Sequence, residues 1–186
     1  MEEKDLKATG IVRRIDDLGR IVIPKEIRKT QRIREGDPVE IFTNREGDIM
    51  LKKYSPIGEL SEFALDYAES LAQVTGGLAC ITDKDTIIAA AGPTRREYEG
   101  KPLDLTFERV LEKRATLNLI EDEQPRIKII ADDDCEYDAE VISTIICNGD
   151  CVGAVAVCGK GKLKTSKENL LELVQTAVNF LGKQLE

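Results

Sequence analysis

Residues 9–42 read TGIVRRIDDLGRIVIPKEIRKTQRIREGDPVEIF, and this stretch decides the fold of the amino-terminal part of the chain. Runs of β-branched residues flank an Asp-Asp-Leu-Gly sequence, whose glycine can adopt the positive φ that a tight turn needs. A proline follows the second run and suits the first position of a helix. The stretch therefore predicts a strand (residues 8–15), a turn (16–19), a second short strand (20–23) and, after Pro24, a helix (25–31).

A hairpin with strands at residues 39–43 and 48–53 completes this unit. The resulting β-β-α-β-β unit has only about fifty residues, and domains of about 60 residues are already marginal because they bury little surface. Apolar side chains also fall on both faces of the first strand, with Ile11 and Ile15 on one face and Val12 on the other. We therefore expect an obligate homodimer in which two interleaved copies cover both faces.

Positive charge is concentrated in the same unit. The whole chain carries 27 Lys+Arg against 35 Asp+Glu, a formal net charge of −8, and the part after Tyr54 is strongly acidic. Between residues 7 and 34, however, basic side chains outnumber acids by three to one. Such asymmetry is typical of a polyanion-binding module joined to a different domain. The basic side chains of this segment are Lys7, Arg13, Arg14, Arg20, Lys25, Arg28, Lys29, Arg32 and Arg34.

The composition excludes several kinds of chemistry. The chain has no His, which excludes Ser-His-Asp and Cys-His catalysis, mixed Cys/His zinc sites and His-ligated iron. No spacing of Lys, Cys or carboxylates indicates another catalytic centre. We therefore expect that the protein is not an enzyme and that it has no metal site. The 5 cysteines form no C-x-x-C pair and are interpreted as small buried side chains, with a metal or redox role as the alternative. Because the sequence has neither a membrane-length apolar run nor a secretion signal, we expect a cytoplasmic protein.

The remaining residues predict an α/β domain with an antiparallel sheet. Helical spacing of apolar side chains and an Asn-Gly-Asp turn mark its elements, and the last helix is expected to begin with a capping box of Thr165 and Glu168. The expected elements are a linker (55–58), a helix (59–74), strands (78–82 and 86–91), a helix (105–114), a strand (126–131), an acidic loop (132–138), strands (141–147 and 151–158) and a helix (166–185).

The amino-terminal stretch, including LGRIVIPKEIR and the downstream LKKYSP, resembles the DNA-binding domain of AbrB-type transition-state regulators. The order of elements after the linker resembles a GAF sensor domain. The resemblance implies a swapped-hairpin, interlocked dimer over residues 1–54, a linker at 55–58 and a GAF-like sensor and oligomerisation domain at 59–186. It also implies a homotetramer joined through the helices of the second domain.

The same resemblance implies which residues contact double-stranded DNA. The arginines with this role in the family correspond to Arg13, Arg20 and Arg28, and Lys29 stands where AbrB has arginine. Arginine suits the role because its planar fork holds a phosphate or a guanine edge with two hydrogen bonds. Lys29 lacks the fork, so we expect it to position the DNA without reading its sequence. With the neighbouring cations, the predicted DNA-binding residues are Lys7, Arg13, Arg14, Arg20, Arg28 and Lys29. The family implies AT-rich sites, read partly through DNA shape.

A GAF domain usually holds a small molecule between its sheet and covering loops. Here the expected walls are the strands near Cys80 and Thr82 and the loops 92–104 and 132–140, and the alternative is a domain that only dimerises. The sequence identifies no cofactor, and it lacks the Asn-Lys-Phe-Asp-Glu pattern of cyclic-nucleotide-binding relatives, so any small-molecule effector is unidentified. The acidic run at residues 132–134 is interpreted as a solvated loop, because adjacent carboxylates diverge and cannot converge on one ion.

Taken together, these features resemble sporulation-stage transcription regulators that act as both activator and repressor. The alternative is an antitoxin-type autorepressor with a toxin-binding C-terminal domain, because antitoxins use the same DNA-binding fold. Antitoxins usually end in a disordered tail, whereas this chain is predicted to end in a periodic helix over residues 166–185.

Overall fold

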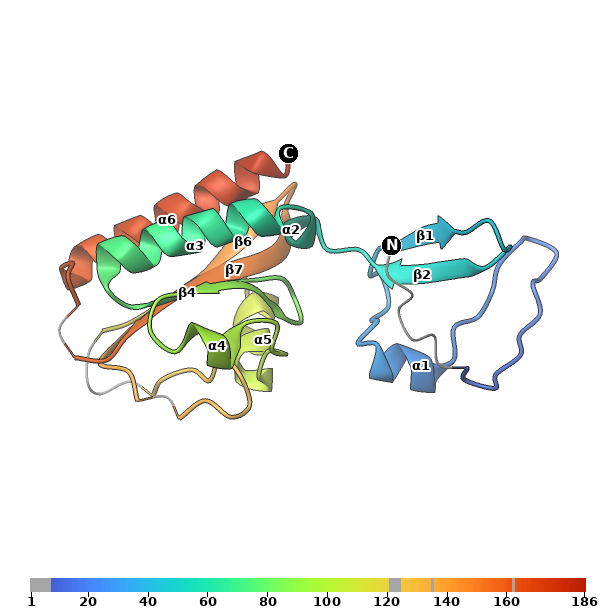
Figure 1. Ribbon diagram of the computed structural model, residues 1–186, viewed down its shortest axis with the longest axis horizontal. Coiled ribbons are helices and arrows are strands. Elements are labelled where there is room, and N and C mark those ends of the chain that lie inside the picture. Colours follow the sequence, from blue (N-terminus) through green and yellow to red (C-terminus); the bar gives the residue numbers. More distant parts are fainter. Residues whose placement is uncertain (1–7, 121–124, 135, 162) are drawn as a thin grey trace. The chain divides into compact units, whose positions relative to one another are not determined.

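The computed structural model describes residues 8–186 except 121–124, 135 and 162. The chain divides into two compact units, of which the first extends to Lys53 and the second begins at Tyr54 (Figure 1). None of the described helices combines the length and the apolar character that crossing a bilayer requires.

The first unit contains one helix and a two-stranded sheet, namely α1 (Lys25–Thr30), β1 (Val39–Thr43) and β2 (Ile49–Lys53). The two strands pair antiparallel. Asn44 fixes the turn between them, because its side-chain oxygen accepts hydrogen bonds from the backbone N–H groups of Glu46 and Asp48 at 3.0 and 2.8 Å. The predicted hairpin is therefore confirmed, with its second strand beginning one residue later.

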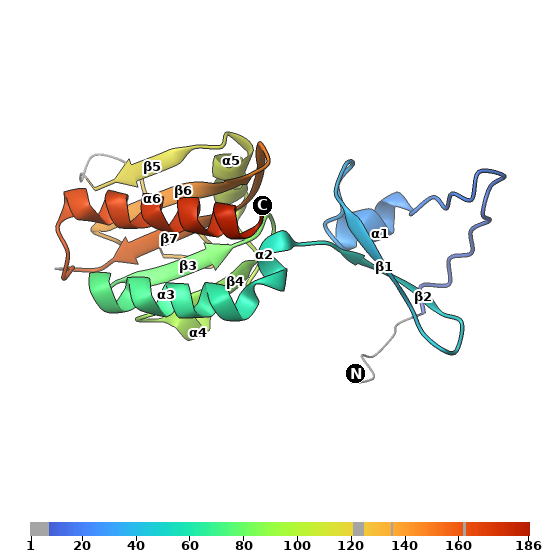
Figure 2. The ribbon, with the colours of Figure 1, turned by 90° about the horizontal axis from the view of Figure 1, so that it is seen from above.

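The strands predicted over residues 8–15 and 20–23 are not formed in the single chain, although both segments are described. The segments form an open loop beside the hairpin (Figure 2). A strand needs partners for its N–H and C=O groups, and β1 and β2 already pair with each other. The apolar side chains of these segments consequently lie in solvent, and Val12, the most exposed of them, is 85% accessible. The prediction of two strands is thus wrong for one copy of the chain.

The second unit is an α/β sandwich. Its helices are α2 (Pro56–Glu59), α3 (Ser61–Thr75), α4 (Arg95–Tyr98), α5 (Leu105–Glu112) and α6 (Lys167–Gln184). Its strands are β3 (Leu78–Thr82), β4 (Ile87–Ala91), β5 (Thr116–Leu119), β6 (Ala139–Cys147) and β7 (Asp150–Gly159). The sheet has the order β4-β3-β7-β6-β5 with antiparallel neighbours. Helices α3 and α6 cover one face, and α4 and α5 lie on the other (Figure 1).

Side chains that alternate along the central strands divide the core of this unit into two layers. On β7, Val155 and Val157 pack in the layer of α3 and α6, whereas Ala154 and Ala156 pack in the layer of α5. The predicted α/β domain with an antiparallel sheet is therefore confirmed.

Two predicted segments have a different structure from the one expected. Residues 55–58, predicted as a linker, begin α2, because Ser55 accepts a hydrogen bond from the N–H of Gly58 at 3.1 Å and Ile57 is fully buried in the core. The edge strand beside β6 is β5, and the predicted strand at 126–131 contributes only an isolated bridge to the fold.

The two long helices also differ in detail. Alanines at every fourth position of α3, Ala64, Ala68 and Ala72, are buried against the sheet, whereas Phe63 is exposed. The ring of Phe63 stacks on Phe180 of α6 at 5.5 Å. Helix α6 begins after Ser166, whose hydroxyl oxygen caps it, so the predicted capping box is replaced by a neighbouring cap.

Candidate nucleic-acid interface and sensor site

The predicted DNA-binding side chains lie in three places of the first unit. Two precede the turn of residues 16–19, one follows it, and two lie in the last turn of α1. Lys7 lies outside the described residues. The five described side chains, all exposed except the half-buried Arg28, are Arg13, Arg14, Arg20, Arg28 and Lys29.

Asp16 organises the turn. Its Oδ1 accepts hydrogen bonds from the backbone N–H groups of Leu18 and Arg20 at 3.0 and 2.8 Å, and Gly19 has a φ of 75°. The predicted turn, with its left-handed glycine, is therefore confirmed. The pKa of Asp16 is lowered, first by the backbone hydrogen bond from Arg20 and then by the Arg20 side chain, so this carboxylate stays ionised at neutral pH.

The same carboxylate orients Arg20. The guanidinium Nε donates to Asp16 Oδ2 at 2.8 Å, and 70% of the side chain of Arg20 is nevertheless exposed. Because Asp16 accepts a side-chain hydrogen bond only from Nε, the two terminal nitrogens of this exposed guanidinium remain available for a phosphate or a base edge. The sequence predicted the role of Arg20 but not its carboxylate partner.

Other cations of the first unit hold the loop between α1 and β1. The ammonium group of Lys53 lies 2.8 Å from the Asp37 carboxylate and donates to the carbonyl of Arg32 at 2.9 Å. The backbone N–H of Arg34 donates to the same carboxylate at 2.8 Å. This carboxylate thus ties the loop to β2, while no hydrogen bond or ion pair joins the described cations of the turn to those of α1.

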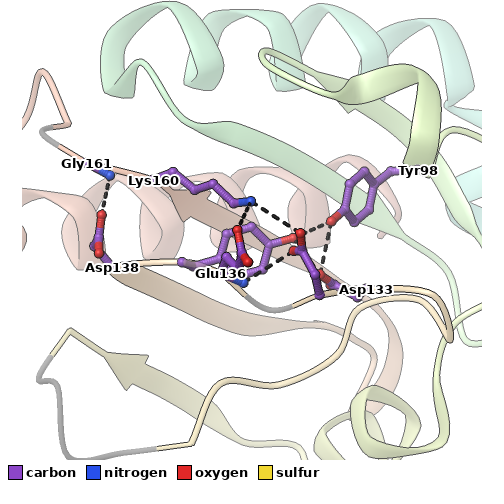
Figure 3. Close-up of polar contacts among 8 residues, drawn as sticks. Tyr98, Asp133, Glu136, Asp138, Lys160 and Gly161 are labelled. Carbon is purple, nitrogen blue, oxygen red and sulfur yellow. Dashed lines mark hydrogen bonds and ion pairs between the residues drawn. The ribbon is translucent and has the colours of Figure 1, made fainter.

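A buried polar cluster lies in the second unit, on the sheet face opposite α3 and α6 (Figure 3). Asp133 is only 3% exposed. Its Oδ1 accepts hydrogen bonds from the hydroxyls of Tyr98 and Tyr137 at 3.1 and 3.0 Å, and the two hydroxyls also contact each other. Burial is the main cause that raises the pKa of both tyrosines, so both hydroxyls keep their protons. The interpretation of residues 132–134 as a solvated loop is therefore wrong for Asp133.

Glu140 is a second buried acid and is fully inaccessible. Its Oε2 accepts the backbone N–H of Ile127 at 2.8 Å, just as Asp133 Oδ2 accepts the N–H of Ile129 at 3.0 Å. Along residues 126–130, these two carboxylates thus accept backbone N–H groups that the carbonyl groups of a neighbouring strand would otherwise accept. Burial raises the pKa of Glu140 to about 7, and the hydrogen bond from Ile127 opposes that rise.

A cavity of about 320 Å³ lies beside the tyrosine cluster. The expected loops 92–104 and 132–140 contribute to its walls, but Cys80 and Thr82, which were expected there, are buried in the sheet and do not line it. Among the described residues, no group of acidic, Cys or His side chains is placed to hold a metal ion. The lining residues are Thr94, Arg96, Glu97, Tyr98, Lys101, Ile130, Asp132, Asp134, Tyr137 and Lys160.

The cysteines of the second unit are free thiols inside the core, and Cys135 lies outside the described residues. Burial raises the pKa of the Cys80 and Cys151 thiols, which makes them poor nucleophiles and metal ligands. The interpretation as small buried side chains is confirmed for Cys80, Cys147, Cys151 and Cys158.

Comparison with known proteins identifies the family of the chain. A family model described as "Stage V sporulation protein T C-terminal, transcription factor" matches residues 59–186. The chain is 43% identical over 181 residues to Stage V sporulation protein T of Bacillus subtilis (strain 168), covering 97% of this chain and 99% of that protein. The chain belongs to the stage V sporulation protein T family.

Membership of the stage V sporulation protein T family confirms the predicted class of function, a sporulation transcription regulator. In the first unit, a family model described as "Antidote-toxin recognition MazE, bacterial antitoxin" matches residues 12–59. The transition state regulatory protein AbrB of Bacillus subtilis (strain 168) is 48% identical over 69 residues, which cover 34% of this chain and 71% of that protein. The predicted AbrB-like amino-terminal domain is therefore confirmed.

A solved structure confirms the fold of the other unit of this stage V sporulation protein T family member. The cofactor-binding GAF domain of the nutrient sensor CodY from Clostridium difficile is 14% identical and superposes with a TM-score of 0.51, covering 87% of this chain and 94% of that chain. At this identity the likeness concerns the fold alone, and it confirms the predicted GAF-like domain.

Replacing Glu140 with glutamine is expected to stabilise the second unit at pH 8 and to change little at pH 5. Since the folded pKa is raised, the folded chain binds more protons than the unfolded chain, and the stability of the parent protein falls as the pH rises from about 4.5 to about 7. The difference between these values corresponds to roughly 3 kcal/mol. Glutamine removes the charge but keeps an oxygen for the N–H of Ile127.

Urea unfolding of the full chain at both pH values measures this effect. The matched control is Glu172→Gln, which removes an exposed carboxylate from α6. An equal gain in both variants, or a gain for Glu140→Gln that is the same at pH 5 and pH 8, contradicts the prediction.

Proposed function

We propose that this protein regulates sporulation genes, activating some and repressing others, by binding double-stranded DNA through residues 1–54. The observation that carries the proposal is the turn at residues 16–20, where Asp16 holds an otherwise exposed Arg20 in place. Phosphate contacts fix a protein on the duplex, and arginine forks read base edges. The proposed contacts are Lys7, Arg13, Arg14, Arg20, Arg28 and Lys29, on AT-rich sites.

In this proposal the DNA-binding form is a homodimer. The segments at 8–15 and 20–23 expose apolar side chains in the single chain, and a second copy supplies both the strand partners and the apolar cover that they lack. The second unit acts as a sensor and oligomerisation domain at 59–186, which links two dimers into a homotetramer. The protein acts in the cytoplasm, where its DNA is.

An antitoxin-type autorepressor is the second candidate, because the MazE model matches residues 12–59. A toxin-binding segment of that kind is usually disordered until it binds. Here the chain after Tyr54 instead forms a compact unit with two apolar core layers. This observation favours the regulator over the antitoxin.

The salt dependence of DNA binding tests the proposal. A dimer that presents Arg13, Arg20, Arg28 and Lys29 twice neutralises up to eight phosphates, so log K against log salt is expected to have a slope of roughly −4 to −7. Fluorescence anisotropy of the full chain with an AT-rich duplex, from 50 to 300 mM salt, measures the slope. A flat dependence, or equal affinity for the corresponding single strand, contradicts the proposal.

A further inference from the structure

The cavity beside α4 is lined by charged side chains, some of which form no ion pair with another described residue. Two cations, Arg96 and Lys101, and two acids, Glu97 and Asp132, line it and are exposed. Among the described residues, none of these four forms an ion pair. The four charges sum to zero, and no other residue that the structure describes in this unit pairs with any of them.

Neighbouring charges behave differently. The third cation of the lining, Lys160, pairs with Asp134 and Glu136 at 3.4 and 3.0 Å (Figure 3). Arg95, which precedes the unpaired Arg96, forms an ion pair with Glu69 of α3, with 3.7 Å between Nη1 and Oε1. Lys160 and Asp134 of the lining and the adjacent Arg95 are thus engaged by other side chains, whereas the remaining four charged lining residues are left for a ligand.

The size of the cavity limits what enters it. Its volume of about 320 Å³ corresponds to roughly ten water molecules, and it lies at the small end of the range for ligand pockets. The wall formed by Tyr98 and Tyr137 is rigid, because both hydroxyls are held by the buried Asp133. A rigid, polar and small site favours a small polar molecule, since little ordering is needed on binding.

We propose that this cavity binds a small zwitterion of the α-amino-acid class, with its carboxylate on Arg96 and Lys101 and its ammonium group on Asp132 and Glu97. A guanidinium holds a carboxylate with two parallel hydrogen bonds. A simple anion would leave both acids unpaired, and a simple cation would leave both bases unpaired. Only a ligand that carries both charges close together uses all four side chains.

This inference rests on the proposed function in one respect, that the second unit senses a small molecule. Isothermal titration calorimetry of the full chain with each of the twenty standard L-amino acids, at up to 1 mM, tests it. At least one is expected to bind once per chain. Its D-enantiomer, the amine without the carboxylate and the acid without the ammonium group are expected to bind at least tenfold more weakly.

Variants connect the binding to the cavity. The double variant Arg96→Gln/Lys101→Gln is expected to weaken binding at least tenfold, and Asp132→Asn is expected to weaken it as well. The matched control Arg95→Gln removes the adjacent cation, which does not line the cavity, and is expected to leave the affinity unchanged. Circular dichroism of each variant tests whether it is folded.

Three results overturn the inference: no L-amino acid binds, binding survives in the double variant, or the deaminated acid binds as tightly as the amino acid. The same protein is titrated with an AT-rich duplex without any amino acid. If DNA is bound and amino acids are not, the inference fails and the proposed function stands. If DNA is not bound, the proposed function fails whatever the amino-acid result.

Discussion

The variant Arg20→Ala is expected to bind an AT-rich duplex about 100-fold more weakly than the parent protein. Each arginine contact to DNA contributes roughly 1–3 kcal/mol, and a dimer loses two of them at once. A combined loss of about 3 kcal/mol corresponds to about two factors of ten. The turn itself is expected to remain, because Asp16 still accepts the backbone N–H groups of residues 18 and 20.

Two comparisons separate the lost contact from lost charge. Arg109→Ala removes an exposed cation from α5 in the second unit and is expected to change the affinity less than twofold. Arg20→Lys keeps the charge without the fork and is expected to give an intermediate affinity. Anisotropy titrations at one fixed salt concentration measure all three, and equal effects of Arg20→Ala and Arg109→Ala contradict the assignment.

The carboxylate of Asp16 adds a further test. In Arg20→Ala this acid loses its side-chain partner and faces the DNA as a bare negative charge, which adds repulsion to the lost contact. The double variant Asp16→Asn/Arg20→Ala is therefore expected to recover part of the affinity. A double-mutant cycle with the single variants gives the coupling between the two side chains.

Local signals in the first unit were sufficient to predict much of it. The Asp-Asp-Leu-Gly turn and the hairpin of β1 and β2 depend on residues close in sequence, such as Gly19 with its left-handed φ and Asn44 with its neighbours. Exposed arginines need no packing partner, so charge alone marks them. The salt bridge of Asp37 with Lys53 was missed because it joins residues of a loop and a strand that no local pattern relates.

In the second unit the element order was predictable but the buried polar cluster was not. Tyr98 and Asp133 are 35 residues apart, and an acidic run is ordinarily exposed, so nothing local distinguishes Asp133 from its neighbours. Glu140 gave a weak signal, since it stands between Ala139 and Val141 in a strand buried along its first seven residues. An acid at such a place needs a hydrogen-bond donor, which Ile127 supplies from a segment that the sequence had suggested was a strand.

The arms at residues 8–15 and 20–23 show a different limit. Their β-branched composition predicts strands correctly only if a partner is present, and the single chain provides none. A sequence pattern indicates which backbone conformation a segment prefers, whereas the formation of a strand also requires hydrogen bonds with a neighbouring strand. The exposed apolar side chains are consequently the strongest structural argument for a second copy.

Val12→Asp is expected to abolish DNA binding and to reduce the proposed tetramer to a dimer. Val12 is 85% exposed in the single chain, so aspartate costs little in an unassembled copy. If two copies interleave, each aspartate becomes a buried charge without a partner, which costs several kcal/mol per copy. A total of roughly 6 kcal/mol raises the dissociation constant of the dimer by about four factors of ten. The dimer is then expected to dissociate at micromolar protein concentrations.

Sedimentation velocity at about 10 μM and DNA titration of the same full-length sample measure the two effects together. The matched control is Leu105→Asp, because Leu105 is also an exposed apolar residue and lies at the first position of α5, where an acid is favourable. It is expected to leave both the oligomer and the DNA affinity unchanged. If Val12→Asp stays tetrameric and still binds DNA, the arms are not an interface, and the cations beside them then act from a single copy.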